Sequence, residues 1–342
     1  MIKKISVVLL LTILLLTFTS CNKAEKDQLV LYTWEGMFPR EVLEGFTKQT
    51  GIEIIYSTFD LNETMLEKLS TANGTSTYDL VIGDDYIIDA VIKRGLAQKL
   101  DKTQIPSFGN INPIYQGYFY DETNEYTVPY GAGIPMIVYN PDEIDFDIDS
   151  YQDLWDPRLK DSIAITANYR LVNGITLMSM GKGLNEADIP TIKAAGEKLL
   201  LLADNIRLVQ DDNTQLSLLN GEAKVALLYT SQVTSVLAEN PNLKAVFPSE
   251  GLGIGIMDFF IPKDAKNAKA AHRFLEYILQ PQVAADCFNY LGYFCTTKAA
   301  DDLVNPNLVF KGEFKGEIMQ NVPEDADEQY NKNWIEFKTA LN

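Results

Sequence analysis

The sequence predicts an α/β protein built as two lobes with a ligand cleft between them. Strand-like and helix-like stretches alternate along most of the chain, which is typical of largely parallel sheets covered by helices. The length of 342 residues exceeds the size at which a single hydrophobic core usually stops growing. Apolar runs at 126–139 and 254–261 are expected to cross between the lobes, and two crossings would form a hinge that lets the cleft close on a ligand.

The N-terminal stretch Met1–Ser20 predicts an export signal that is not part of the fold. Two lysines precede the apolar run Ile5–Phe18, and small residues follow it. This run is shorter than the roughly 20 apolar residues that span a bilayer. The ending resembles a bacterial lipoprotein signal, so Cys21 is expected to carry the lipid, with 21–28 as a polar tether.

The first folded unit is predicted to be a strand, a short loop and a helix. Leu29–Thr33 has strand composition, Trp34 and Glu35 lie in the loop, and an apolar-periodic run follows Pro39. Open α/β sheets bind ligands just beyond the carboxyl ends of such strands. Trp34 is therefore a candidate ligand contact, and the alternative is a core aromatic at the edge of a lobe.

The same alternation continues along the chain, and Asn62 is expected to cap the helix that carries Met65, Leu66 and Leu69. The first lobe is expected to comprise 29–131 and 259–304, and the second lobe 132–258 and 305–342. Glycines at 131–133 suit a crossover that has to bend. Further strands are expected at 52–56, 79–82, 126–130, 135–139, 163–166, 206–209, 225–229 and 254–261, and helices at 40–50, 62–69, 87–92, 171–180, 189–202, 213–219, 267–279, 283–291 and 328–341.

Composition excludes several classes of function. The formal net charge of −18 argues against nucleic acid or an anionic membrane surface as a partner, because both require basic protein surfaces. An acidic cleft would attract a cationic ligand, although acidity for solubility alone explains the charge equally well. Besides Cys21 only Cys287 and Cys295 remain, so a disulfide framework is excluded and a single bridge stays open.

The sequence offers little for catalysis. His272 is the sole histidine and is expected on a helix surface, so a Ser-His-Asp triad and a multi-histidine metal site are excluded. No glycine-rich nucleotide motif occurs. We therefore expect no catalytic residue, no metal and no cofactor. Hydrolysis by a pair of carboxylates stays open, because any two cleft acids could serve.

Aromatic and acidic residues recur at the ends of predicted strands. Aromatic faces attract ammonium groups, and carboxylates add charge-assisted hydrogen bonds. Asp84 and Asp85 have a structural alternative as helix caps, and so do Asp211 and Asp212. The recurring positions are Trp34–Glu35, Asp84–Tyr86, Asp211–Asp212, Tyr229 and Met257–Asp258.

Several long segments are similar to the bacterial periplasmic spermidine/putrescine-binding proteins. They include LYTWEGMFPREVLEGF, YDLVIGDDYIID, YTVPYGAG and PSEGLGIGIMDFFIPKDAKNAKAA, and the similarity spans essentially the whole chain after the signal. The resemblance implies a type II periplasmic-binding-protein fold without catalytic activity. It also implies a monomer, in the periplasm or lipid-anchored at the outer face of the cytoplasmic membrane, that closes on a polyamine and delivers it to an ABC permease driven by a separate ATPase.

The resemblance also implies ligand contacts, some with altered side chains. Asn168 and Leu171 stand where the family has acids, and either Asp258 is a family aspartate shifted by one residue or Met257 replaces it. These losses predict a ligand gripped mainly from the first lobe, or a different ligand such as an amino acid, another cationic metabolite or a metal complex. The implied contacts are Trp34, Glu35, Asp84, Tyr86, Asn168, Asp211, Tyr229, Asp258, Tyr293 and Gln320.

Overall fold

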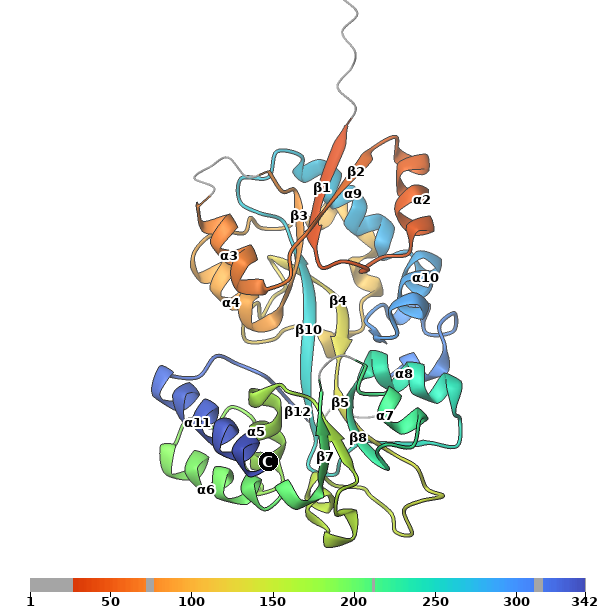
Figure 1. The fold of residues 1–342 in the computed structure, drawn as a ribbon. Helices are drawn as coiled ribbons and strands as arrows, with labels where there is room; N and C mark the ends of the chain where they lie inside the picture. The colour runs from red at the N-terminus through yellow and green to blue at the C-terminus, as the bar shows by residue number, and fades with distance from the viewer. Residues whose placement is uncertain (1–26, 72–76, 211–212, 311–315, 342) are drawn as a thin grey trace, which may run out of the picture.

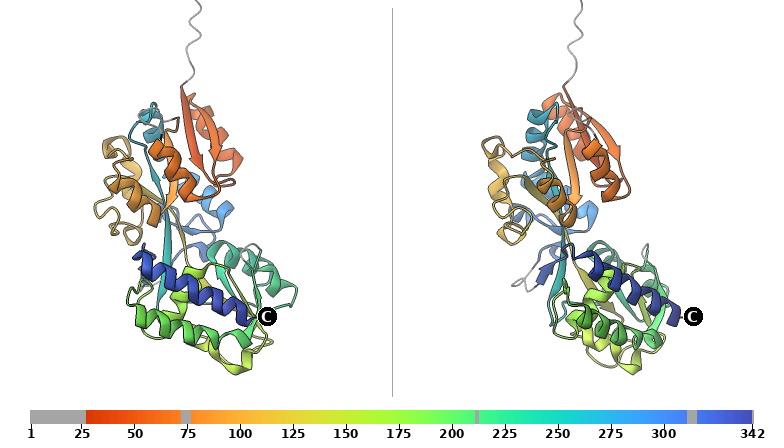
Figure 2. Two further views of the ribbon diagram at one scale, coloured as in Figure 1. Left: turned by 60° about the vertical axis from the view of Figure 1, so that its left-hand side comes forward. Right: turned by 90° about the vertical axis from the view of Figure 1, so that its left-hand side faces the viewer.

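The computed structural model describes residues 27–71, 77–210, 213–310 and 316–341. Two α/β lobes lie one above the other in Figure 1, and the long strand β10 (Leu252–Phe260) runs through both. The side views in Figure 2 show the same separation into two lobes. The predicted two-lobed α/β architecture is confirmed.

The first lobe contains a mixed sheet in the order β11-β4-β10-β3-β1-β2, with β12 paired to β10. Strands β1, β2 and β3 are parallel, whereas β10 runs antiparallel to β3 and β4. Its other strands are β1 (Gln28–Thr33), β2 (Glu53–Thr58), β3 (Leu80–Asp84), β4 (Thr127–Gly133) and β11 (Phe294–Cys295); its helices are α2 (Arg40–Thr50), α3 (Asn62–Thr71), α4 (Asp85–Lys93), α9 (Ala268–Ile278) and α10 (Pro281–Leu291). The short strand β12 (Gly316–Ile318) pairs with the first residues of β10 and lies in the second lobe (Figure 1).

The second lobe contains a five-stranded sheet in the order β7-β6-β8-β5-β9. Helix α11 packs along α5 and α6, as Figure 2 shows from two sides. The strands are β5 (Pro135–Tyr139), β6 (Ile163–Ile165), β7 (Ile206–Val209), β8 (Val225–Tyr229) and β9 (Lys244–Val246); the helices are α5 (Tyr169–Met178), α6 (Ile189–Leu200), α7 (Leu216–Leu219), α8 (Thr230–Glu239) and α11 (Glu324–Ala340).

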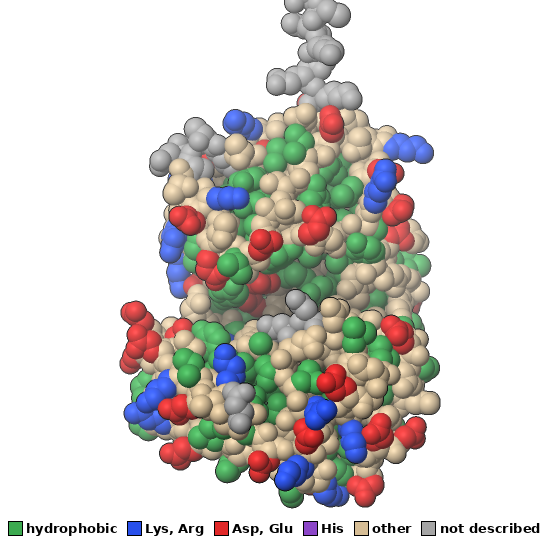
Figure 3. Space-filling model, in the orientation of Figure 1, with side chains coloured by type: hydrophobic (Ala, Val, Ile, Leu, Met, Phe, Trp, Pro, Cys, Tyr) green, Lys and Arg blue, Asp and Glu red, His purple; other side chains and the backbone are tan. Residues whose placement is uncertain are grey.

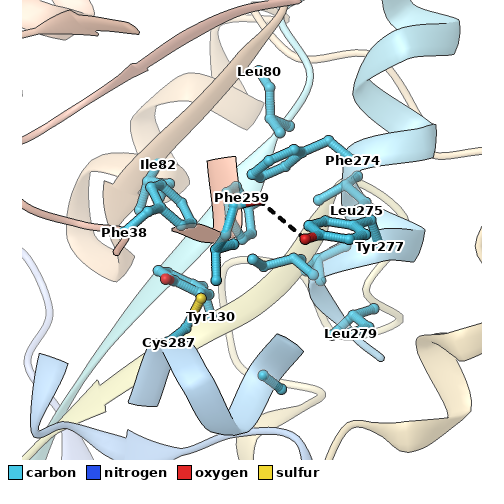
Figure 4. Packing of buried hydrophobic residues seen from close by; sticks show 14 of the residues in the cluster. Phe38, Leu80, Ile82, Tyr130, Phe259, Phe274, Leu275, Tyr277, Leu279 and Cys287 are labelled. Carbon is cyan, nitrogen blue, oxygen red and sulfur yellow. Dashed lines mark hydrogen bonds between the residues drawn. The ribbon is translucent and has the colours of Figure 1, made fainter. Parts of the chain in front are cut away.

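An aromatic core holds the first lobe together behind the cleft. Phe38 stacks on Tyr130 with ring centroids 5.1 Å apart, and Phe274 meets Phe38 edge-on at 5.6 Å. Figure 4 shows these rings converging on Phe259 of β10. Burial of such rings contributes both apolar area and favourable ring geometry. The core thereby fixes β10 and the loop after β1, which carry cleft residues.

The crossover from β4 to β5 is shorter than the sequence suggested. The glycines at 131–133 lie inside β4 rather than in a break, and Ile134 alone separates β4 from β5. A Cβ atom on Gly131 would lie 2.6 Å from Cε of Met257 on β10. A side chain at this position would therefore displace the flexible end of Met257, which lines the cleft.

Most predicted elements are confirmed. The short strands β9, β11 and β12 were not predicted, and neither was helix α8, whose sequence TSQVTSVLAE is mostly polar. His272 is not a surface residue: it is buried, and its Nε2 accepts a hydrogen bond of 2.9 Å from the backbone N–H of Asp101. Asn62 does not cap α3, because both polar atoms of its side chain contact Asp84 at the end of β3.

Cys287 and Cys295 are both buried and free. In the described part of the chain, none of the helices combines the length and the apolar character needed to cross a membrane.

Candidate ligand-binding site

A cavity of about 320 Å³ lies between the two lobes. Figure 3 shows the surface hollowed at this level of the molecule. The first lobe and β10 supply most of one wall, and the second lobe supplies the other. The lining residues are Asp84, Asp85, Tyr86, Gly133, Pro135, Asn168, Leu171, Leu184, Tyr229, Gly253, Ile254, Gly255, Met257, Tyr293 and Met319.

An outer cavity of about 430 Å³ adjoins the inner one on the first lobe. Four side chains line both cavities, so the two form one continuous cleft: Asp84, Tyr86, Met257 and Tyr293. The outer part adds the half-buried Trp34 and the exposed acids Glu35 and Glu63.

Asp84 is the acid placed to meet a ligand. It follows β3 directly, at the carboxyl end of the strand, and its side chain makes no hydrogen bond that caps α4. Its Oδ2 accepts a hydrogen bond of 2.7 Å from Nδ2 of Asn62. Burial raises the pKa of the Asp84 carboxyl to about 6; the bond from Asn62 opposes this rise and the nearby Glu63 adds to it. Asp84 is thus a carboxylate at neutral pH in a site that disfavours negative charge.

Asp85 has a structural role instead. One carboxylate oxygen accepts from the backbone N–H of Tyr86 at 2.7 Å, and the other accepts from Ile256 on β10 at 2.9 Å. Burial, followed by the charge of Asp84, raises the pKa of Asp85 well above its ordinary value. Both oxygens are committed to backbone, so Asp85 ties α4 to β10.

Aromatic side chains surround the position in front of Asp84. The hydroxyl of Tyr86 lies 3.1 Å from Nδ2 of Asn62 and donates to Oε1 of Glu63 at 3.2 Å, which fixes the ring. Trp34 packs on Phe59 with ring centroids 4.9 Å apart, and its carbonyl accepts from Tyr56 at 2.7 Å. Ring faces held this way attract ammonium groups.

The wall formed by the second lobe is different in chemistry. Leu171 and Leu184 are 5% and 2% exposed, and with Met319 they form an apolar surface. Asn168 caps α5, because its Oδ1 accepts from the backbone N–H of Leu171 at 3.0 Å. The hydroxyl of Tyr229 lies 3.3 Å from Oγ1 of Thr166. Every described residue that the second lobe contributes to the inner cavity is uncharged.

Asp258 does not line the cleft, so its prediction as a ligand contact is corrected. A register shift between Met257 and Asp258 in the pairing of β10 with β4 places Met257 in the cleft and Asp258 in the interior. Asp258 is fully buried, and its Oδ2 accepts from the hydroxyl of Tyr120 at 2.7 Å. The alternative that Met257 occupies the ligand position is the one the geometry supports.

The remaining predicted residues fall into two groups. Gln320 is exposed and lines a separate hollow of about 500 Å³ with Tyr118 and Glu317, so it is not brought together with Asp84. Asp211 and Cys21 lie outside the described residues. The cleft does assemble Trp34, Glu35, Asp84, Tyr86, Asn168, Tyr229 and Tyr293.

Comparison with known proteins decides the family. A sequence profile of the bacterial extracellular solute-binding proteins matches residues 41–311. The chain belongs to this family. Its relatives include the spermidine/putrescine-binding periplasmic protein of Salmonella typhimurium, which is 34% identical over 319 residues, or 89% of this chain and 91% of that protein. The corresponding protein of Escherichia coli is 33% identical over 86% of this chain and 85% of its own length.

A solved structure agrees with this assignment. The spermidine/putrescine substrate-binding protein PotD from Streptococcus pneumoniae, in complex with calcium and HEPES, superposes with a TM-score of 0.84 at 28% identity, covering 92% of this chain and 100% of that one. The predicted periplasmic-binding-protein fold is therefore confirmed. The chain is grouped with the spermidine/putrescine-binding members of the solute-binding family.

Proposed function

We propose that this protein captures a polyamine, putrescine or spermidine, between its two lobes and delivers it to an ABC importer. The observation that carries the proposal is Asp84, a carboxylate that faces an interlobe cavity and is surrounded by Tyr86, Trp34 and Tyr293. The relatives named above, whose names specify spermidine and putrescine, support the same ligand class.

The geometry suits an alkyl ammonium. Asn62 occupies Oδ2 of Asp84, and no described residue donates to Oδ1, which leaves that oxygen for the ligand. A charge-assisted hydrogen bond contributes about 1.5–3 kcal/mol net. Each nearby ring adds about 0.5–2 kcal/mol, depending on how far the ammonium is desolvated. The methylene chain of the ligand would pack against Met257, Leu171 and Leu184.

The uncharged second-lobe wall favours a second candidate within the same transport role. A small cation with one charged end and one uncharged end would place its charge at Asp84 and its other end against Leu171, Leu184 and Met319. A diamine would instead direct its second ammonium toward the outer acids, such as Glu35 and Glu63. The alternatives predict different ligand preferences.

The wider role follows from the same proposal. The protein would act as a monomer, anchored through lipid on Cys21 in the periplasm or at the outer face of the cytoplasmic membrane. It would dock on a permease whose ATPase is a separate subunit, and it would perform no catalysis. We also propose that the chain passes from one lobe to the other at 131/132, 258/259 and 304/305.

Calorimetric titration of the protein lacking residues 1–21 tests the proposal. The protein is first unfolded and refolded to remove bound ligand, and then titrated separately with putrescine and spermidine. We expect one-to-one binding at micromolar or tighter dissociation constants. The Asp84→Asn variant should bind at least ten-fold more weakly, whereas exposed Glu67→Gln on α3 should bind as the wild type does. No heat with either amine would reject a polyamine ligand, and formation of a product would instead favour the carboxylate hydrolase.

A further inference from the structure

The side-chain amide of Asn62 connects the residues that would meet the ligand. Asn62 is 5% exposed and lines the outer cavity. Its Nδ2 donates to Oδ2 of Asp84 at 2.7 Å and to the hydroxyl oxygen of Tyr86 at 3.1 Å. Its Oδ1 accepts from the backbone N–H of Asp84 at 3.4 Å. These contacts fix the orientation of the amide: its nitrogen faces the carboxylate of Asp84, since only the nitrogen can donate, and its oxygen faces the backbone N–H.

The charges that surround Asp84 all oppose its ionisation. No lysine or arginine occurs among the residues that line the two cavities. Like charges and burial both favour a protonated carboxyl, so a hydrogen-bond donor is needed to keep Asp84 charged. The titratable neighbours are Glu63 on α3, Asp85 and Tyr86 on α4, Asp258 on β10, and Tyr293 after α10, with Glu35 and Asp60 at the rim of the cleft.

We propose that Asn62 is a positioning residue of the amine site: it holds one oxygen of Asp84 so that the other faces the ligand as a carboxylate. This inference rests on the proposed function and adds a residue outside the set of ligand contacts. Asn62 acts through Asp84 and Tyr86 rather than by touching the amine. The same amide orients the Tyr86 ring, so one side chain would align both the charge and the aromatic face.

A dependence of amine binding on pH follows from this arrangement. The proton and the ammonium compete for the same carboxylate, so affinity is full above the pKa of Asp84 and falls about ten-fold per pH unit below it. With that pKa at about 6, binding at pH 5 should be about ten-fold weaker than at pH 7. Loss of the Asn62 donor would raise the pKa of Asp84 and move the whole profile to higher pH.

The test measures putrescine affinity by calorimetry from pH 5 to pH 8 for five proteins. They are the wild type, Asn62→Leu, Asn62→Ala, Asp84→Asn and the control Glu67→Gln. Asn62→Leu removes the donor with a branched apolar side chain, and Asn62→Ala removes it with a smaller one. Both should move the pH of half-maximal affinity upward by one unit or more. Asp84→Asn should bind weakly at every pH, and Glu67→Gln should match the wild type.

The outcomes separate this inference from the proposed function. If the wild type binds putrescine and neither Asn62 variant moves the pH profile, Asn62 has only a packing role and the inference is overturned. If the Asn62 variants lose affinity equally at all pH values, Asn62 likewise does not act through the charge of Asp84, and the inference is overturned. If the wild type binds neither putrescine nor spermidine at any pH, the proposed function itself fails. Circular dichroism melting checks that each variant is folded, and Asn62→Ala keeps the test valid if Asn62→Leu does not fold.

Discussion

Replacement of the buried Asp258 by asparagine is expected to stabilise the protein at high pH. Burial, as the largest cause, raises the pKa of this carboxyl from 3.8 to about 8, and the bond from Tyr120 opposes the rise. In the unfolded chain an aspartate ionises near pH 4, so between pH 4 and pH 8 the folded state keeps a proton that the unfolded state releases. Stability from this group therefore falls as pH rises through that window.

The magnitude follows from the same structure. A pKa difference of about four units corresponds to on the order of 5 kcal/mol that opposes folding at pH 8, at about 1.4 kcal/mol per unit. Asparagine does not ionise in the unfolded chain, so this free-energy cost of folding is absent in the variant. Oδ1 of Asp258 is buried without a partner, and an amide NH₂ at that position would cost about 1–3 kcal/mol. The net gain for Asp258→Asn at pH 8 is thus on the order of 2–4 kcal/mol.

Urea unfolding of ligand-free protein at pH 5 and pH 8 measures this difference. The stability of Asp258→Asn relative to wild type should improve by roughly 3–4 kcal/mol from pH 5 to pH 8. The exposed Asp142→Asn serves as a control for general charge effects, because the protein carries a net charge of −18. A variant that is destabilised equally at both pH values would refute the reasoning, since it would show that the Asp258 carboxyl does not hold its proton in the fold.

Three further substitutions test the cleft and the second lobe. Trp34→Ala should weaken putrescine binding roughly 5- to 30-fold while the melting temperature stays within a few degrees. Unchanged affinity in a titration would show that Trp34 is a core aromatic and not a ligand contact. Gly196→Ala should lower the free energy of unfolding by about 1–3 kcal/mol in urea, because the new methyl group would overlap the buried amide of Asn333. Asn321→Ala removes a 3.2 Å hydrogen bond to the carbonyl of Tyr86; we expect a two- to five-fold loss of affinity with unchanged stability, and a large stability loss would contradict a role confined to the cleft.

Elements with a strong apolar pattern were predictable from sequence. Strands β5, β7 and β8 have the predicted bounds, since each is a short, mostly apolar run followed by a polar residue. Helix α8 was not predicted because only two of its apolar side chains, Val233 and Val236, are buried, so its hydrophobic periodicity is weak. The burial of His272 was not predicted because its hydrogen-bond partner, the backbone N–H of Asp101, is distant in sequence.

The site was predictable in its residue types but not in its connections. Asp84 and Tyr86 stand at a strand end, where α/β folds place ligands, and the cleft contains both. The bulge at Met257 and Asp258 could not be predicted, because it arises from pairing with β4 and leaves no local signal. Asn62 was predicted to be a helix cap from its local sequence. Its contact with Asp84 could not be predicted, because the two residues are 22 positions apart.

The division of the cleft into a charged wall and an uncharged one has a kinetic consequence. Long-range attraction between the cation and Asp84, Glu35 and Glu63 would speed encounter, so the association rate constant should decrease with ionic strength. If the lobes close on the ligand as proposed, its escape would require the apolar surface formed by Leu171, Leu184 and Met319 to withdraw, a step that salt would screen little. Capture and release would then respond to the medium independently, with the first lobe governing how often a ligand arrives and the second how long it stays.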